Sequence, residues 1–281
     1  MDRIVYLDNN ATTQMAQEVI EIMAENADLY GNASSMHTLG RSSYTAIEWA
    51  RGEVSALIDS DPGEIYFVSG ASEANNTVFN VFRDRIDAGD KRNRILLSSV
   101  EHPASIETMK YLVSKGYKVE TVPVDGVGEL KLDELEKMMG DDVCLVSIMT
   151  GNNESGVIQP VKKAAEIAHK YGAYFHTDAT QAIGKIPVSV KDIGADYLSM
   201  SAHKFYGPKG IGVLYAKKGV PLSPFVHGGH QEKGYRAGTY NNQAIIGMGK
   251  AAELARVNLK SEHDQLWRLR EKLRKGIEER I

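Results

Sequence analysis

The decapeptide SAHKFYGPKG, residues 201–210, places Lys204 directly after a histidine and just before a Gly-Pro-Lys-Gly turn. Most isolated lysines in such turns are solvated. Here, however, the lysine follows DYLSM (196–200), an apolar run typical of a buried strand. Partial burial destabilises an ammonium group, and the neutral amine that results can form an imine with an aldehyde. Lys204 is therefore a candidate for covalent chemistry if the sequence supplies suitable partners.

Small, polar or ionisable residues also follow four earlier apolar runs. They are Gly-Ala-Ser after EIYFVS (64–69), Glu101 and His102 after RILLSSV (94–100), Thr-Gly-Asn-Asn-Glu after CLVSIM (144–149), and Asp178 after AYFHT (173–177). Open α/β sheets bind ligands outside the carboxyl ends of their strands. Together with the run before Lys204, these strand ends predict one site along one edge of a sheet.

The stretch GASEANN (70–76) offers backbone N–H groups and the Ser72 hydroxyl at the start of a predicted helix, a natural seat for a phosphate. Taken alone, this stretch is better explained by Ser72 as the N-cap of that helix. The sequence contains neither GxGxxG nor the P-loop pattern GxxxxGK followed by Ser or Thr. A dinucleotide or a P-loop nucleotide is therefore not indicated.

A phosphate seat, a lysine and an aspartate on one edge together suggest pyridoxal 5'-phosphate. Its aldehyde needs an amine for an imine link, here Lys204, and its ring nitrogen needs a carboxylate, here Asp178, so that the protonated ring can act as an electron sink. His102 can stack on the ring, and Gln181 and Asn153 can hydrogen-bond its phenolic oxygen or the substrate.

The elements that must position these residues alternate between strands and helices. Helical spacing of apolar residues follows the strand runs in SIETMKYLVSKG (105–116) and in VKKAAEIAHKYG (161–172). This alternation predicts βαβ units and an α/β fold, with a mostly parallel sheet that helices cover on both faces. The turn FYGPKG is too short for a crossover helix, so IGVLYA (211–216) is expected to run antiparallel to its predecessor.

The bulk composition excludes several classes of protein. The 281 residues are 42% hydrophobic and 25% charged, enough for a large core, and the net charge of −4 gives no general attraction to nucleic acid or acidic membranes. A single cysteine excludes a disulfide framework and a thiolate metal cluster. The start, MDRIVYLDNNATT, lacks the form of a signal peptide, and no apolar run reaches membrane-spanning length, so we expect a cytoplasmic protein.

Longer motifs recur along the whole chain in a recognisable order. They are YLDNNATT (6–13), GNASSMHTLGR (31–41), SGASEANN (69–76), EHPASIETM (101–109), NNESGVIQP (152–160), HTDATQAIGKIP (176–187), SAHKFYGPKGIG (201–212) and GGHQEKGYRAGT (228–239). In these motifs the chain resembles the NifS/IscS-type cysteine desulfurases, members of the class V aminotransferase group of fold-type I pyridoxal-phosphate enzymes. Ser72 stands where threonine is usual, Ala33 where proline is usual, and His230 where glycine is common; Ser72 keeps the hydroxyl.

The resemblance implies a role for each matching residue. Lys204 would carry the imine to the cofactor and, with His102 and Asp178, form the catalytic set. The phosphate would be held by the Ala71 backbone, Ser72, Ser201 and His203. Asp178 would pair with the ring nitrogen, His102 would stack on the ring and move protons, Gln181 would contact the phenolic oxygen, and Asn153 would lie beside it and the substrate carboxylate. Thr239 would reach the phosphate of a neighbouring subunit, which implies a homodimer.

The resemblance also implies an activity and a domain organisation. L-cysteine would be converted to L-alanine, with sulfur passed to an acceptor scaffold protein for iron–sulfur cluster or thio-cofactor assembly. Residues 1–15 would associate with a small domain, residues 16–258 would form the cofactor-binding large domain, and residues 259–281 would form a helix leading to a small domain largely absent from this chain. The family's acceptor cysteine and substrate-carboxylate arginine have no match in the sequence.

Alternatives remain open on the sequence alone. A selenocysteine lyase or another β-eliminating pyridoxal-phosphate enzyme belongs to the same class, and a catalytically incomplete scaffold subunit belongs to a different one. His176 and His203 form only a weak metal pattern. Cys144, in an apolar run, is expected to be an inert core residue. Trp49 and Trp267 are expected to pack, and RLREKLRK (268–275) is expected to be a solvated helix face.

Overall fold

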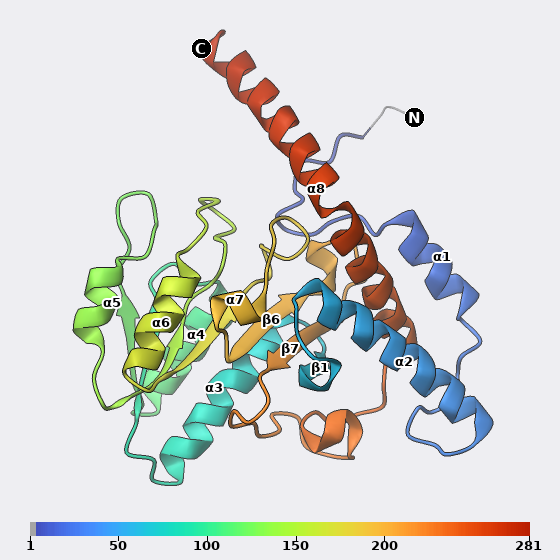
Figure 1. Cartoon of the computed structure of the whole chain (residues 1–281), viewed down its shortest axis with the longest axis horizontal. Helices are drawn as coiled ribbons and strands as arrows, with labels where there is room; N and C mark the ends of the chain where they lie inside the picture. Colours follow the sequence, from blue (N-terminus) through green and yellow to red (C-terminus); the bar gives the residue numbers. More distant parts are fainter. Residues whose placement is uncertain (1–3) are drawn as a thin grey trace.

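The computed structural model describes residues 4–281, so the first three residues of the segment predicted for 1–15 lie outside it. Its centre is a seven-stranded sheet with the order β1-β7-β6-β5-β4-β2-β3 (Figure 1). The strands are β1 (Ile65–Val68), β2 (Arg94–Ser98), β3 (Lys118–Val122), β4 (Val143–Ser147), β5 (Tyr174–Asp178), β6 (Tyr197–Ser201) and β7 (Gly212–Ala216). Neighbouring strands from β3 to β6 pair in parallel, and β7 is antiparallel to both β1 and β6. The mostly parallel sheet and the antiparallel strand after Lys204 are both confirmed.

Helices cover both faces of the sheet, as predicted. They are α1 (Gln17–Glu25), α2 (Thr38–Leu57), α3 (Ala71–Asp87), α4 (Pro103–Ser114), α5 (Leu132–Met138), α6 (Val161–Lys170), α7 (Val190–Ile193) and α8 (Asn242–Glu278). The strand β3 was not expected, because it lies at the sheet edge and most of its side chains are not buried, so it lacks the apolar signal of the others. Within the described residues, no helix has both the length and the apolar character needed to cross a membrane.

The sheet separates two hydrophobic cores, because successive side chains of a strand point to opposite faces. On β1, Tyr66 and Val68 belong to the core under α3 and α4. Ile65 and Phe67 belong instead to the larger core under α2, α6 and α8. The same alternation recurs on β2, β6 and β7, whereas on β4 the adjacent Cys144 and Leu145 both belong to the core under α3 and α4. Since both faces are buried, the central strands read in the sequence as near-continuous apolar runs.

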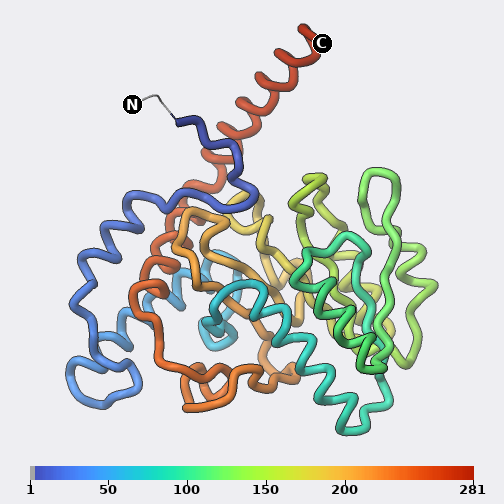
Figure 2. The backbone as a smooth tube through the Cα atoms, turned by 180° about the vertical axis from the view of Figure 1, so that it is seen from behind, coloured from blue at the N-terminus to red at the C-terminus, as the bar shows by residue number. Residues whose placement is uncertain are grey.

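The long helix α8 has two different halves. It spans 37 residues, about 55 Å at 1.5 Å per residue. Its buried side chains end at Ala255, and the helix then projects from the body of the protein in both views (Figure 1, Figure 2). It runs without interruption through the predicted boundary at 258–259, so that division stays a prediction.

The sequence predicted that Trp49 and Trp267 pack and that residues 268–275 form a solvated helix face. Trp49 is 37% exposed, and one edge of its ring packs against Gly249 of α8. Trp267 is 56% exposed, and its ring lies parallel to that of His263, with 6.4 Å between the ring centroids. The expectation that Trp267 packs in this chain is therefore wrong, because the part of α8 that carries it lies outside the core. The basic stretch 268–275 is exposed at all positions except Glu271, as predicted for a solvated face.

Arg51, on α2, makes a buried ion pair that fixes a loop against β1. Its guanidinium donates to both carboxylate oxygens of Glu232 at 2.8 Å and to the Ile65 carbonyl oxygen at 2.7 Å. Glu232 also accepts from the Phe67 N–H at 3.1 Å. Glu232 and Lys233 have left-handed φ angles of 45° and 59°, a conformation that costs a non-glycine residue about 1–3 kcal/mol. The ion pair therefore holds a strained turn in place.

We expect Arg51→Met to lower the free energy of unfolding by about 3–5 kcal/mol, because it leaves the Glu232 carboxylate buried without its partner. Urea unfolding followed by circular dichroism measures this loss. The double variant Arg51→Met/Glu232→Gln is the matched control, since it removes both charges and should recover part of the loss. A loss in the single variant no larger than that of a surface ion pair, about 1 kcal/mol or less, would contradict the assignment.

Candidate active site

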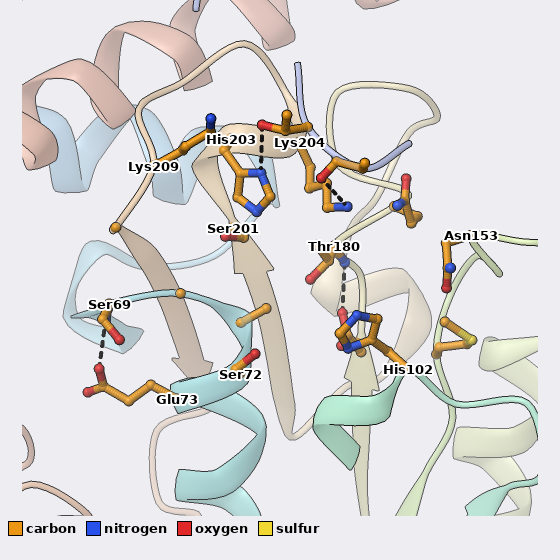
Figure 3. A pocket seen from close by; sticks show the side chains of 18 of the residues that line it. Ser69, Ser72, Glu73, His102, Asn153, Thr180, Ser201, His203, Lys204 and Lys209 are labelled. Carbon is orange, nitrogen blue, oxygen red and sulfur yellow. Dashed lines mark hydrogen bonds between the residues drawn. The ribbon is translucent and has the colours of Figure 1, made fainter. Parts of the chain in front are cut away.

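A cavity of about 520 Å³ lies at the carboxyl ends of the strands. Nine of the ten predicted site residues line it: Ala71, Ser72, His102, Asn153, Asp178, Gln181, Ser201, His203 and Lys204. In Figure 3, Ser72, Ser201 and His203 lie on the left of the cavity, and His102 and Asn153 lie on the right. The tenth, Thr239, lines a neighbouring cavity together with Arg236. The structure thus brings nine of these residues together, while their individual roles stay predictions.

The N-terminus of α3 forms one wall of the cavity. Ser72 is the second residue of this helix and Gly70 is its N-cap, so the explanation of Ser72 as the N-cap is wrong. Gly70 has no side chain that could cap the helix, and the first backbone N–H groups of any helix lack partners within it. These N–H groups and the Ser72 hydroxyl are therefore available to an anion, which the helix dipole also favours.

Glu73 places a negative charge in the same turn of α3. Its carboxylate accepts from the Ser69 N–H at 2.8 Å and from Nε of Arg236 at 2.9 Å. Burial alone would raise the pKa of Glu73, but the bonds from Arg236 and Ser69 outweigh it and hold the pKa below its ordinary value. Glu73 is therefore ionised, and Arg236 balances its charge beside the phosphate seat.

Asp178, the last residue of β5, is a carboxylate buried at the floor of the cavity, 4% exposed. Its Oδ1 accepts from the Thr180 N–H at 3.0 Å and its Oδ2 accepts from Nδ2 of Asn75 at 2.7 Å. Among residues 4–281, no lysine, arginine or histidine forms an ion pair with it. A buried carboxylate held in this way can pair with a cation that enters the cavity.

Lys204 follows β6 in a short 3-10 turn, Ala202–Lys204. Its ammonium donates to the carbonyl oxygens of Asn10 and Ala11, the second at 3.0 Å. Burial lowers the pKa of Lys204, and the nearby carboxylates of Asp178 and Asp8 offset part of this effect. The amine is thus easier to neutralise than that of a solvated lysine, as the sequence predicted.

The N-terminal segment that contacts Lys204 is itself anchored to the site. The N–H and the hydroxyl of Thr13 both donate to the His203 carbonyl oxygen at 2.9 Å, and the Thr12 hydroxyl lies 3.1 Å from Nδ1 of His203. Asn10 donates from Nδ2 to the Asn153 carbonyl oxygen at 3.2 Å. Burial, followed by three nearby lysines, lowers the pKa of His203, so its ring is neutral near pH 7. Residues 10–13 therefore form part of the site.

His102 is the N-cap of α4. Its Nδ1 accepts from the Ala104 N–H at 3.1 Å, so in the neutral ring the proton is on Nε2. This bond fixes the ring at the edge of the cavity.

Two further titratable groups lie beneath the site. His176 is fully buried between the hydroxyls of Ser147 and Ser199, at 2.8 and 3.0 Å, and burial lowers its pKa to about 4. It is therefore neutral and links three adjacent strands. No group of three or more histidine, cysteine or acidic side chains among the described residues is placed to hold a metal ion.

Glu101, the residue before His102, is the second of these groups. Its Oε1 accepts from the Ser98 hydroxyl at 2.6 Å and from the Met149 N–H at 2.7 Å, while its Oε2 has no partner among the described residues. Burial raises the pKa of Glu101 to about 8; the two hydrogen bonds oppose this shift, and the charge of Asp178 adds to it. Glu101 is therefore a neutral acid at pH 7, and it joins the ends of β2 and β4.

We expect Glu101→Gln to gain stability relative to the wild type as the pH rises from about 5 to 8. Above its ordinary pKa of 4.5 the unfolded chain loses the Glu101 proton, whereas the folded chain keeps it up to about pH 8. The wild type therefore loses up to about 1.4 kcal/mol per pH unit over this range, and the uncharged variant does not. Urea unfolding at pH 5, 6, 7 and 8 measures the difference between the two proteins. A difference that stays constant with pH would show that Glu101 has an ordinary pKa.

Several residues at the site had no predicted role. Asn10, Ala11 and Thr12 belong to YLDNNATT, and Lys185 belongs to HTDATQAIGKIP, so the motifs contained them without indicating what they contact. Glu101 was noted only as a residue at a strand end. The contacts of Asn10, Ala11 and Thr12 join parts of the chain 171 to 193 residues apart, and no local pattern in a sequence shows such contacts.

The sequence matches known proteins along nearly its whole length. The family model described as "Aminotransferase class-V" matches residues 5–281. The chain is 48% identical over 283 residues to a cysteine desulfurase of Sinorhizobium fredii, covering 99% of this chain and 72% of that protein. It is 44% identical over 282 residues to the cysteine desulfurase IscS of Dictyoglomus turgidum, covering 100% of this chain and 71% of that protein. A solved NifS-like protein superposes with a TM-score of 0.95 at 43% identity, covering 99% of this chain and 76% of that one.

Proposed function

Because this chain belongs to the aminotransferase class-V family, we propose that it is a pyridoxal-phosphate-dependent cysteine desulfurase. In this reaction L-cysteine and an acceptor thiol give L-alanine and the persulfide of the acceptor. The observation that carries the proposal is that Lys204 and Asp178 line one cavity whose wall is the open N-terminus of α3. The names of the relatives favour this activity over a selenocysteine lyase or a scaffold subunit.

The residues of the cavity fit the cofactor group by group. Lys204 offers an amine whose pKa burial lowers, as an imine link to an aldehyde requires. Asp178 is a buried carboxylate without an ion-pair partner in the described chain, as a protonated ring nitrogen requires. The N–H groups of Ala71 and Ser72, the Ser72 hydroxyl and Ser201 lie where a phosphate can bind. A cavity of about 520 Å³ is also within the usual size range of cofactor sites.

When bound, the cofactor supplies an electron sink for the bonds at the substrate α-carbon. The protein must then position the substrate and move protons. His102, whose neutral ring carries its proton on Nε2, and the amine of Lys204 are the groups at the cavity that we assign to proton transfer. Asn153 lies at the rim, and we assign it to the substrate carboxylate.

The sulfur acceptor and the partners follow from the same proposal. Cys144 is the one cysteine of the sequence, and it is buried on β4. The acceptor thiol is therefore supplied from outside these 281 residues. Homodimerisation, with Thr239 at the neighbouring site, sulfur delivery to an acceptor scaffold for iron–sulfur cluster or thio-cofactor assembly, and a cytoplasmic location remain predictions of the resemblance and the sequence.

We expect Lys204→Ala to remove the visible absorption band that pyridoxal phosphate gives with the wild-type chain. Alanine formation from L-cysteine, with dithiothreitol as the acceptor thiol, should fall by about 10²–10⁴-fold, because the variant loses both the imine link and a proton-transfer group. Absorption spectra and alanine assays of both proteins measure this. Lys191→Ala, at an exposed lysine paired with Asp59, is the matched control and should behave as wild type. A wild-type chain that develops no band would overturn the proposed function.

We expect Cys144→Ala to leave the absorption band and the rate of alanine formation within about twofold of wild type. Burial raises the pKa of Cys144 to about 12, so its thiolate is scarce and inaccessible. In the wild type, a thiol reagent should label Cys144 at least about 100-fold more slowly in the folded than in the urea-unfolded chain. Fast labelling of the folded chain, or loss of activity in the variant, would instead identify Cys144 as a sulfur acceptor.

A further inference from the structure

Lys185 is a largely buried cation beside the site that does not line the cavity. It follows a turn that begins at Asp178, and its place is fixed by Gly184, which has a φ of +74°. A Cβ added at Gly184 would lie 2.9 Å from Cβ of Phe205, the neighbour of Lys204. The turn is therefore pressed against the segment that carries Lys204, and a side chain at 184 would push the two apart.

The ammonium of Lys185 has one hydrogen-bond partner among the described residues. It donates to Oε1 of Gln181 at 2.5 Å, and no carboxylate of the described chain pairs with it. A buried ammonium without a counter-ion is unfavourable, and burial, followed by the charge of Lys204, lowers the pKa of Lys185 to about 8. Nothing in its contacts explains this lysine as a stabilising residue.

The contact with Lys185 decides which way the Gln181 amide points. Since Oε1 accepts from Lys185, Nε2 must lie on the other side of the amide, where it donates to the Asn10 carbonyl oxygen at 3.0 Å. The same carbonyl oxygen accepts from Lys204. The N–H₂ group of Gln181 and the amine of Lys204 therefore lie next to each other, because both donate to the Asn10 carbonyl oxygen.

We propose that Lys185 is a positioning residue for the cofactor. Its ammonium holds the Gln181 amide with the N–H₂ toward Lys204, and its charge stabilises a negative phenolic oxygen on the cofactor. The inference rests on the proposed function, because Gln181 is the residue assigned to that oxygen. Two titratable groups interact electrostatically with Lys185. The charge of Lys204 lowers the pKa of Lys185, and the charge of Lys185 contributes to lowering the pKa of His203.

The experiment compares four full-length proteins loaded with pyridoxal phosphate: wild type, Lys185→Met, Lys185→Gln and Lys185→Arg. Absorption spectra between pH 5 and 10 give the pKa of the bound cofactor's spectral change, and titration with cofactor gives its Kd. We expect Lys185→Met to raise this spectral pKa by about 0.5–1 pH unit, the effect of removing one positive charge from a partly buried site, and to weaken cofactor binding several-fold. Lys185→Gln should show the same spectral shift with a smaller loss of affinity, because its amide can still donate to Gln181. Lys185→Arg should stay close to wild type.

Two further measurements separate positioning from a structural role. Removing an unpaired buried charge should raise the melting temperature, so Lys185→Met is expected to unfold at a higher temperature than wild type at pH 7, whereas loss of a structural contact would lower it. In a Gln181→Ala background, Lys185→Met should weaken cofactor binding less than it does in the wild-type background, because the part of its effect that acts through the Gln181 amide is already lost and only the charge effect remains. Lys191→Met is the matched control and should change none of these values.

The outcomes distinguish the two proposals. A wild-type chain that never gives the absorption band overturns the proposed function, and this inference with it. A wild-type band with an unchanged spectral pKa in Lys185→Met, or a Kd effect that persists undiminished without Gln181, overturns this inference alone.

Discussion

The direction of the strands is the constraint on which the site depends. From β2 through β6 the central strands run parallel, so their carboxyl ends meet at one edge of the sheet. The backbone groups along the strands are paired, and only the residues beyond the ends are free to serve a ligand. His102 and Lys204 follow two different strands and Asp178 ends a third, yet they come to one cavity because each of those strands stops at the same edge. The fold needs no further device to bring them together.

Some of the charged side chains at the cavity have a partner of opposite charge in the described chain, and others do not. Glu73 is balanced by Arg236, and Glu101 keeps its proton, so neither adds a free negative charge. Within residues 4–281, Asp178 is a buried carboxylate without an ion-pair partner, and no carboxylate contacts the amine of Lys204. A buried charge without a partner is unfavourable, and these two groups match the opposite charges of a bound cofactor. The site is therefore arranged for a group that is not part of the polypeptide.

The sequence predicts the sheet, the antiparallel strand and the place of the site because these depend on local apolar runs and on the polar residues directly after each run. The interpretation of Ser72 as an N-cap was wrong because serine is preferred over glycine at this position, whereas α3 begins at Ala71 and its N-cap is Gly70. The pattern of apolar residues gave no sign of β3, whose edge position leaves it polar, and it misplaced Trp267 on a helix that leaves the core. The contacts of Asn10 with Gln181 and Lys204 could not be predicted, because they depend on how distant segments meet in the folded chain.

The sheet separates the two cores, and this limits which substitutions can compensate for one another during evolution. A substitution that alters the volume of Phe79 or Phe82 on one face can be compensated only by neighbours on that face, since the backbone of the sheet lies between the two sets. Along β1, β2, β6 and β7, odd and even positions can therefore diverge as two independent series. In a chimaera of two relatives, exchanging all the strand residues that face one core should therefore preserve its packing. Exchanging a contiguous segment of a strand would instead alter both cores at once.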